Sequence, residues 1–299
     1  MKKLLMVSIL LTAAFAAQAQ LKVTPQMAKG MEKNYSTEAT VNMPGSAAFK
    51  MTSDTKVTVI DATADGYTVE MLNTAFTTDA AADNMMGQLM AISEETMKGL
   101  AIRLALDKDG NVKQILNYDE LKSKTDIMAE KLVGELFKKA PQLQQMMPKD
   151  AVLQQIKESV NQESMLRSLQ NTTSPLALSG KTIMTGAQDE YVGDQNMKMK
   201  RMYFVNGKNV TTNSTMNMSK DDLKKFIIEQ VEKMAPEQAD MIKQNIDAVI
   251  DSGMLKFDMS ETATYELQDD GWVKSIKAEN KNEAMGQKSV INTVVTLLK

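Results

Sequence analysis

Four short turns, each containing Asp-Gly or Asn-Gly and flanked by alternating apolar and polar residues, constrain this fold more than any other feature of the sequence. Such pairs suit the tight turns that join antiparallel strands, because glycine and asparagine tolerate positive φ angles. The turns are Ala64-Asp65-Gly66, Asp107-Lys108-Asp109-Gly110, Asn206-Gly207 and Asp269-Asp270-Gly271. The sequence therefore predicts a sheet assembled from hairpins.

Periodicity places strands and helices around these turns. Period-two segments predict hairpins or strands at 55–76, 100–116, 197–218, 254–267, 272–277 and 290–298. Helical spacing and capping signals predict helices at 83–98, 119–139, 150–171, 219–234 and 236–253. Hairpins interspersed with helices predict an α+β fold, with a mainly antiparallel curved sheet and helices packed on one face.

A shared plan links two parts of the chain. A strand, a turn and a second strand precede a helix at 100–139 and again at 197–234. Residues 171–193, with Pro175 and several small residues, are typical of a connection. We therefore expect a single α+β domain over 20–299, arranged as two similar halves, 20–175 and 190–299.

Residues 1–19 have the pattern of a cleavable signal peptide. Lys2 and Lys3 precede an apolar run, Leu4–Ala17, which ends in the Ala17-Gln18-Ala19 cleavage motif. The run is shorter than the ~20 apolar residues that span a bilayer, so a membrane anchor is disfavoured. Cleavage between Ala19 and Gln20 predicts a periplasmic or extracellular protein. Of the 299 residues, 280 remain, and the net charge changes from −3 to −5 as two lysines are lost.

The chain contains no histidine and no cysteine. This composition excludes Ser-His-Asp and Cys-His catalysis, imidazole and thiolate metal sites, disulfides and a lipid-anchored N-terminal cysteine. Carboxylates could still catalyse, but local spacing does not reveal a carboxylate pair. We therefore expect a non-enzyme without a cofactor. The mildly acidic charge also makes nucleic acid an unexpected partner.

Methionine is the compositional outlier, with 26 residues. A two-residue turn at Asn206-Gly207 would pair Val205 with Lys208 and Met197 with Met216, and a four-residue turn would pair Met197 with Met218. Four thioethers would then share one face: Met197, Met199, Met216 and Met218. Three alternatives remain open, namely ordinary core packing, a Cu(I) site, and an adaptable lining for acyl chains.

Two resemblances accompany these patterns. The segment Leu21–Tyr35, the Asp109-Gly110 turn and the helix start Glu120-Leu121-Lys122 resemble those of uncharacterised exported β-rich proteins of Bacteroidota. Strand pairs wrapped against helices after a signal peptide are similar to the half-barrels of periplasmic lipoprotein carriers. The resemblances imply an architecture and no reaction.

The leading functional hypothesis is a non-catalytic periplasmic or cell-surface protein that binds a hydrophobic ligand, such as a lipid or lipoprotein, or another envelope component. The alternative is a structural or protein-interaction module of the envelope. An empty apolar cavity would favour the carrier hypothesis, whereas a fully packed core would count against it.

Overall fold

The computed structural model describes residues 20–81, 85–139, 148–170, 173–193, 197–234, 236–251, 257–284 and 286–299. The predicted signal peptide, 1–19, lies outside the described residues. The strands are β1 (Gln20–Lys22), β2 (Glu32–Asn42), β3 (Phe49–Ala62), β4 (Gly66–Thr78), β5 (Ala101–Asp107), β6 (Val112–Ile115), β7 (Thr182–Met184), β8 (Gln188–Val192), β9 (Lys198–Asn206), β10 (Asn209–Met216), β11 (Phe257–Leu267), β12 (Val273–Ala284) and β13 (Gln287–Leu297). The helices are α2 (Met85–Met97), α3 (Tyr118–Lys139), α5 (Lys149–Ser159), α6 (Gln162–Leu169), α7 (Lys220–Met234) and α8 (Pro236–Asp251).

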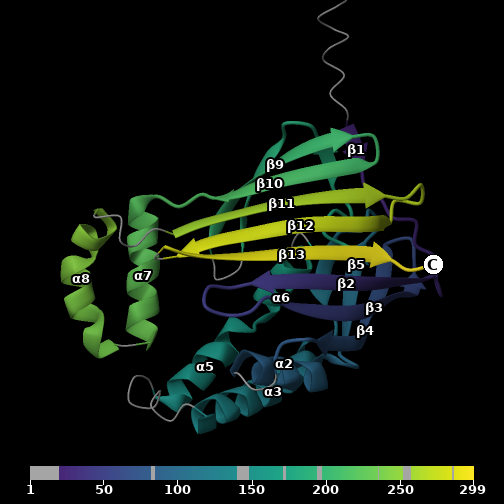
Figure 1. Cartoon of the computed structure of the whole chain (residues 1–299). Coiled ribbons are helices and arrows are strands. Elements are labelled where there is room, and N and C mark those ends of the chain that lie inside the picture. The colour runs from purple at the N-terminus through teal and green to yellow at the C-terminus, as the bar shows by residue number, and fades with distance from the viewer. Residues whose placement is uncertain are drawn as a thin grey trace, which may run out of the picture.

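One open antiparallel sheet of 11 strands dominates the structure (Figure 1). Its strand order is β6-β5-β4-β3-β2-β13-β12-β11-β10-β9-β8, and β1 pairs with β7 in a separate two-stranded sheet. The prediction of a mainly antiparallel sheet built from hairpins is confirmed. Strands β2 and β13 are neighbours, so residues from both proposed halves form one sheet.

The hairpin between β9 and β10 differs in register from the expected one. Asn206 pairs with Asn209, which leaves Gly207 and Lys208 as the two-residue turn, and Val205 pairs with Val210. The expected pairing of Val205 with Lys208 is therefore wrong. The reason lies in Gly207, whose φ of +59° supplies the positive angle at the first turn position while Asn206 stays in the strand.

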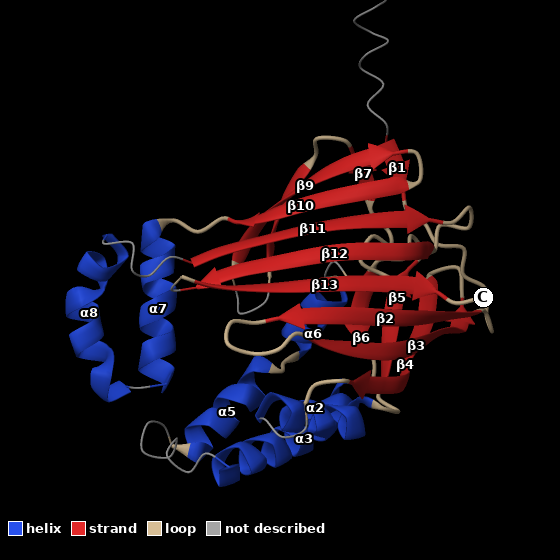
Figure 2. Ribbon diagram, viewed as in Figure 1, coloured by secondary structure: helices blue, strands red, loops and turns tan. Residues whose placement is uncertain are grey.

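All predicted helical regions contain helices, but their placement departs from a single covering layer. Helix α2 lies against β4, whereas α7 and α8 lie beyond the strand ends (Figure 2). Packing of the helices on one face is thus not confirmed. The topology explains the difference, because α7 and α8 connect β10 to its direct neighbour β11 and need not cross the sheet.

Several elements carry no clear sequence signal. Strand β2 was not predicted, and the expected connection at 171–193 contains β7 and β8. The same region includes a buried segment, 174–179, with the sequence Ser-Pro-Leu-Ala-Leu-Ser. This plug segment, as we call residues 174–179, packs into the concave side of the sheet instead of running over the surface.

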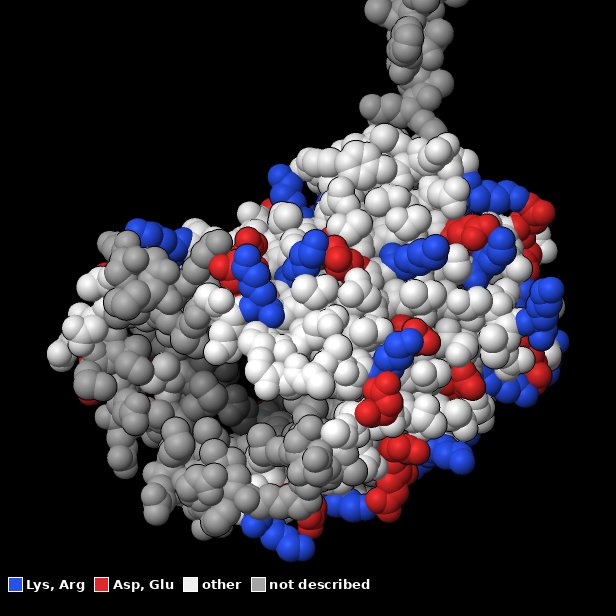
Figure 3. Space-filling model, in the orientation of Figure 1, with Lys and Arg blue, Asp and Glu red and all other residues white. Residues whose placement is uncertain are grey.

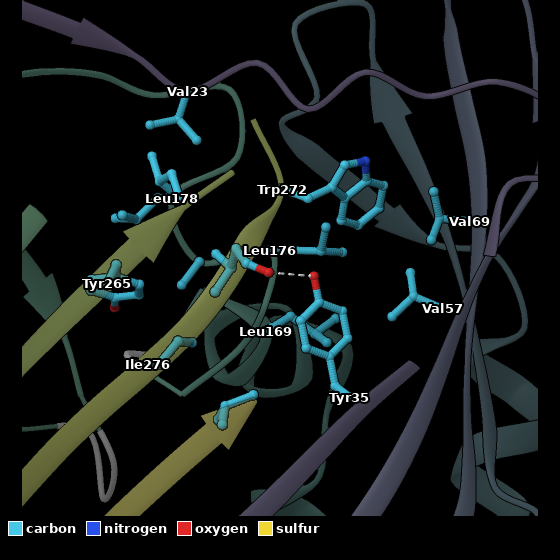
Figure 4. Close-up of a cluster of buried hydrophobic side chains, with 14 of the residues drawn as sticks. Val23, Tyr35, Val57, Val69, Leu169, Leu176, Leu178, Tyr265, Trp272 and Ile276 are labelled. Atoms are coloured by element: carbon cyan, nitrogen blue, oxygen red, sulfur yellow. Dashed lines mark hydrogen bonds between the residues drawn. The ribbon is translucent and has the colours of Figure 1, made fainter. Parts of the chain in front are cut away.

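The hydrophobic core lies between the plug segment and the concave face. Leu176 and Leu178 belong to one buried cluster with residues from both halves of the strand order. Val57 and Val69 come from β3 and β4, and Tyr265 comes from β11 (Figure 4). Burying a leucine side chain stabilises the fold by about 1.5–3 kcal/mol. The apolar end of the concave face is consequently filled by the protein's own side chains.

The segment that precedes β2 closes this end of the core. The main-chain amide of Gln26 donates to the main-chain oxygen of Asp270 at 2.8 Å. The Trp272 indole donates to the main-chain oxygen of Gln26, also at 2.8 Å. Gly271 adopts a φ of +79°, and a Cβ there would lie 2.6 Å from the main-chain oxygen of Thr24. The β11–β12 turn therefore needs glycine for two reasons.

Candidate functional site: a buried polar band on the concave face

The concave face changes character along strands β10, β11 and β12. Near the plug segment it is apolar, where Val210 pairs with Tyr265 and Tyr265 with Ile276. Directly opposite residues in an antiparallel pair project to the same side, so these side chains share the inner face. The next inner pair, Thr212 with Ala263, is small, and beyond it Ser214 pairs with Glu261. The inner face thus becomes polar towards the ends of the strands that lead to α7 and α8.

Five buried oxygen atoms in this region make no hydrogen bond within the described residues, although the Ser214 hydroxyl lies close enough to the Tyr191 hydroxyl to favour its ionised form. They come from three adjacent strands and all project from the inner face. We call these residues the inner polar band: Thr212 and Ser214 of β10, Tyr265 of β11, and Asn280 and Asn282 of β12. A sixth such atom, Oδ1 of Asn73, lies on β4.

The energetic cost of this arrangement is large. Each buried polar group without a partner costs about 1–3 kcal/mol. The four other than Ser214 together cost roughly 4–12 kcal/mol, which is comparable to the whole stability of an ordinary domain. Buried polar groups in folded proteins almost always have partners. The inner polar band therefore requires hydrogen-bond partners other than the described residues.

A charged cluster adjoins the band on strands β8 and β9. The Arg201 guanidinium is buried and donates from Nε and Nη2 to the two carboxylate oxygens of Asp189, both at 3.0 Å. The Tyr203 hydroxyl donates to the same carboxylate at 2.8 Å. Arg201 also lies over the rings of Tyr191 and Tyr203, at 4.5 and 5.1 Å from their centroids. This cluster borders the band on the β9 side, because Arg201 of β9 pairs with Ser214 of β10.

The pKa values of this cluster follow from its burial and pairing. Burial alone would raise the pKa of the Asp189 carboxyl, but the hydrogen bonds and charge of Arg201 outweigh burial and hold it below its usual value. Burial raises the pKa of Tyr191 to about 12 and that of Tyr265 further still. The tyrosines thus remain neutral hydroxyl groups near neutral pH.

Lys181, directly after the plug segment and Gly180, brings a second positive charge near Arg201. Burial, and then repulsion from Arg201, lower the pKa of Lys181 to about 8. Asp189 offsets these effects only in part. Burial of the charged Lys181 side chain therefore destabilises the folded protein.

Two of the four predicted thioether residues, Met199 and Met216, occupy inner positions next to the band. Met216 pairs with Met199, and not with Met197 as a turn at Asn206-Gly207 would require. Met197 and Met199 are both buried. On β11, Met259 pairs with Asn282 of the band. Cu(I) binding by Met197, Met199, Met216 and Met218 stays a prediction, which competition with a chromogenic Cu(I) chelator would test. No group of three or more acidic side chains in the described ranges could hold a metal ion.

The outer face of the sheet is a weaker candidate for a binding site than the inner polar band. Lys and Arg side chains alternate there with Asp and Glu (Figure 3), as in the pair between Lys274 and Glu266 at 2.7 Å. A shallow, open depression of about 410 Å³ lies between the β2–β3 and β12–β13 connections, near Pro44 and Gln287. Neither feature gathers unpaired buried groups as the inner polar band does.

Sequence reasoning missed the inner polar band and the Arg201 cluster. Inward-facing Thr212 and Ser214 in the segment Thr211–Thr215 stand among outward-facing polar residues, so polarity does not alternate there. The pairing register across three strands is needed to bring the band together. The one signal in the sequence was that the segment of β10 contains few apolar residues although the Asn-Gly turn predicts a strand there.

No protein-family model and no curated protein matches the sequence. Among solved structures, the chain is similar to one of lipovitellin, described for its lipid–protein interactions, with 8% identity and a TM-score of 0.39. That match covers 92% of this chain but 26% of the lipovitellin chain, so this chain spans about a quarter of it.

Two further similarities are weaker. An S-type phycobiliprotein lyase from Guillardia theta has 5% identity and a TM-score of 0.22, with 91% of this chain and 89% of that chain covered. A porin-like protein from Bacteroides uniformis has 12% identity and a TM-score of 0.17, with 88% and 95% covered. These values are too low to support an argument about function. No helix among the described residues has the length and apolar character needed to cross a membrane.

Proposed function

We propose that this chain is a non-catalytic, exported binding protein of the periplasm or cell surface whose amphipathic ligand lies against the concave face of the sheet. The observation that carries the proposal is the inner polar band. Its buried oxygens on three adjacent strands have no partners among the described residues. Because the side chains of Thr212, Ser214 and Tyr265 are buried by the protein itself, a ligand would reach them only by displacing the side chains that cover them. It would then supply those partners and recover the cost of leaving them unpaired.

The neighbouring side chains favour a ligand with an apolar part as well. Met199, Met216 and Met259 occupy inner positions beside the band. Methionine is flexible and polarisable, and it adapts to apolar ligands of variable shape. The plug segment, in contrast, already fills the other end of the concave face. These placements narrow the expected hydrophobic ligand to one that also carries hydrogen-bonding groups.

Export and the absence of catalysis rest on the sequence. The predicted signal peptide supports a location outside the cytoplasm, where a lipid or another envelope component would be available. Without histidine or cysteine, the chain lacks the residues of the commonest catalytic sites. The charged residues beside the band are used in pairing, as the bidentate contact of Arg201 with Asp189 illustrates.

Native mass spectrometry of protein purified from its own cell envelope tests the proposal. We expect a bound molecule that is released on unfolding and is lost from the Thr212→Val variant. Thr262→Val on the outer face of β11 is the matched control and should retain the ligand. A clean apo mass, combined with increased stability of Thr212→Val, would overturn the proposal, because it would show that the hydroxyl is simply an unpaired group in a dry core.

A further inference from the structure

The chemistry of the inner polar band identifies the kind of polar group that fits it. Thr212, Ser214 and Tyr265 supply hydroxyls, which both donate and accept hydrogen bonds. Asn280 and Asn282 supply carbonyl oxygens, which only accept. A partner for this set must donate to the amide oxygens and also accept from the hydroxyls. Hydroxyl groups meet both requirements, whereas a phosphate or carboxylate at neutral pH mainly accepts.

The charges around the band are balanced. Arg201 and Glu261 occupy inner positions on either side of Ser214, since each pairs with a residue opposite it on β10. Arg201 is already committed to Asp189 through two hydrogen bonds. Asp189 thus lies near both positive groups, Lys181 and Arg201, and Glu261 lies across β10 from Arg201. The surroundings favour a neutral ligand group over an anionic one.

The dimensions of the band require a ligand group with several hydroxyls. Strands β10 and β12 are two strand spacings apart, about 10 Å. Along the strands, the inner positions from Tyr265 to the level of Asn282 cover three steps of two residues, roughly 20 Å. One ligand group would therefore need hydroxyls on more than one side to reach the whole band.

From these observations we infer that the polar part of the ligand is an uncharged, hydroxyl-rich group, such as a sugar or polyol, rather than a phosphate or carboxylate. This inference rests on the proposed function and specifies the ligand class for the same site. The methionines beside the band would then contact the apolar part of the molecule.

The test compares two probes that share an apolar chain and differ in their polar group, octyl glucoside and octyl phosphate. Titration calorimetry with the ligand-free full chain, below the concentrations at which either probe forms micelles, measures both affinities. We expect octyl glucoside to bind at least tenfold more tightly. Ser214→Ala and Thr212→Val should each weaken octyl glucoside binding about tenfold, which corresponds to the loss of ~1.4 kcal/mol.

Outward-facing substitutions serve as controls. Thr215→Ala follows Ser214 directly and points to the opposite face, and it should leave the affinity unchanged. Equal or tighter binding of octyl phosphate would overturn the hydroxyl-rich class but leave the proposed binding function standing. If neither probe binds and protein from the envelope is also ligand-free, both the ligand class and the proposed function are wrong.

Discussion

The hydroxyl of Tyr35 donates a hydrogen bond of 2.9 Å to the main-chain oxygen of Val273 (Figure 4). Tyr265 belongs to the same hydrophobic cluster and is as deeply buried, yet its hydroxyl has no partner among the described residues. Comparing the two tyrosines therefore distinguishes a hydroxyl whose hydrogen bond stabilises the fold from a hydroxyl that the proposed ligand would bind.

Removing the two hydroxyls should have opposite effects on stability. Tyr35→Phe removes the hydrogen bond to the Val273 oxygen and should cost about 1–2 kcal/mol in the free energy of unfolding. Tyr265→Phe removes an unpaired buried hydroxyl and should leave the ligand-free protein equally stable or more stable. Urea unfolding of both variants measures the difference, and a larger loss for Tyr265→Phe would contradict the assignment of Tyr265 to the inner polar band.

Breaking the Arg201 ion pair should destabilise the protein more than breaking an exposed pair. Asp189→Asn leaves the buried guanidinium without its counter-charge, but the Asp189 side chain is 41% exposed, so we expect a loss of about 1–3 kcal/mol. Asp61→Asn, which removes the exposed partner of Lys29, is the control and should cost less than about 0.5 kcal/mol.

The pH dependence of that loss has a definite sign. The folded-state pKa of Asp189 is lowered, so its stabilising effect is present above the ordinary carboxyl pKa and disappears as the pH falls through the lowered value. The stability difference between wild type and Asp189→Asn should thus shrink below about pH 4. A difference that stayed constant down to pH 2 would argue against a charged Asp189 in the folded protein.

Lys181 offers a test in the alkaline range. Its pKa falls to about 8 in the folded protein, so the unfolded chain binds the proton more tightly and burial of the charge destabilises the fold at neutral pH. Lys181→Met should therefore stabilise the protein at pH 7, on the order of 2–3 kcal/mol. The advantage should decline as the pH rises from 8 towards 9.5, because wild-type Lys181 then becomes neutral.

The exposed Lys200 on β9 provides the control for that substitution. Lys200→Met removes the same charge from a residue whose side chain faces solvent, and it should change stability little at either pH. Melting temperatures of both variants at pH 7 and pH 9.5 suffice. A gain for Lys181→Met that persisted undiminished at pH 9.5 would indicate that packing, and not charge, limits this position.

Two glycines with positive φ allow the free-energy cost of backbone strain to be measured apart from the cost of a steric clash. Gly271 and Gly207 have φ angles of +79° and +59°, but a Cβ at Gly207 would meet no atom within 4 Å, whereas at Gly271 it would strike the Thr24 oxygen. Gly207→Ala should cost about 1–2 kcal/mol from backbone strain alone. Gly271→Ala should cost at least 1 kcal/mol more, as measured by chemical unfolding. Equal losses would contradict close contact between the β11–β12 turn and the segment before β2.

The fold could be predicted from the sequence where turns and periodicity agree. The hairpin of β3 and β4 and that of β5 and β6 combine an Asp-Gly turn with alternating apolar residues, and both are confirmed. Helix α7 also begins as predicted, with the Ser219 hydroxyl accepting from the Asp222 amide at 3.1 Å. Local signals were sufficient in these regions because the residues that define each element lie within a few positions of one another.

Other elements depend on contacts that local patterns do not encode. Strand β2 is mostly polar, with Tyr35, Ala39 and Val41 as its only apolar or aromatic residues, and it becomes a strand by pairing with β3 and β13. The plug segment reads as a connection because Pro175 and its serines favour turns, yet Leu176 and Leu178 are buried by sheet strands distant in sequence. The inner polar band is invisible for the same reason, since only the register of three strands assembles it.

The contact between Gln26 and Trp272 has a consequence for how the chain folds. These residues are 246 positions apart, and β2 must likewise find β13 near the other end of the chain. Topologies dominated by distant pairings fold slowly, because loop-closure entropy must be overcome before such contacts form. Until β13 is available, the central edge of β2 stays unpaired and open to other strands. The protein should therefore acquire its native sheet late and in one concerted step, with a need for protection from aggregation before then.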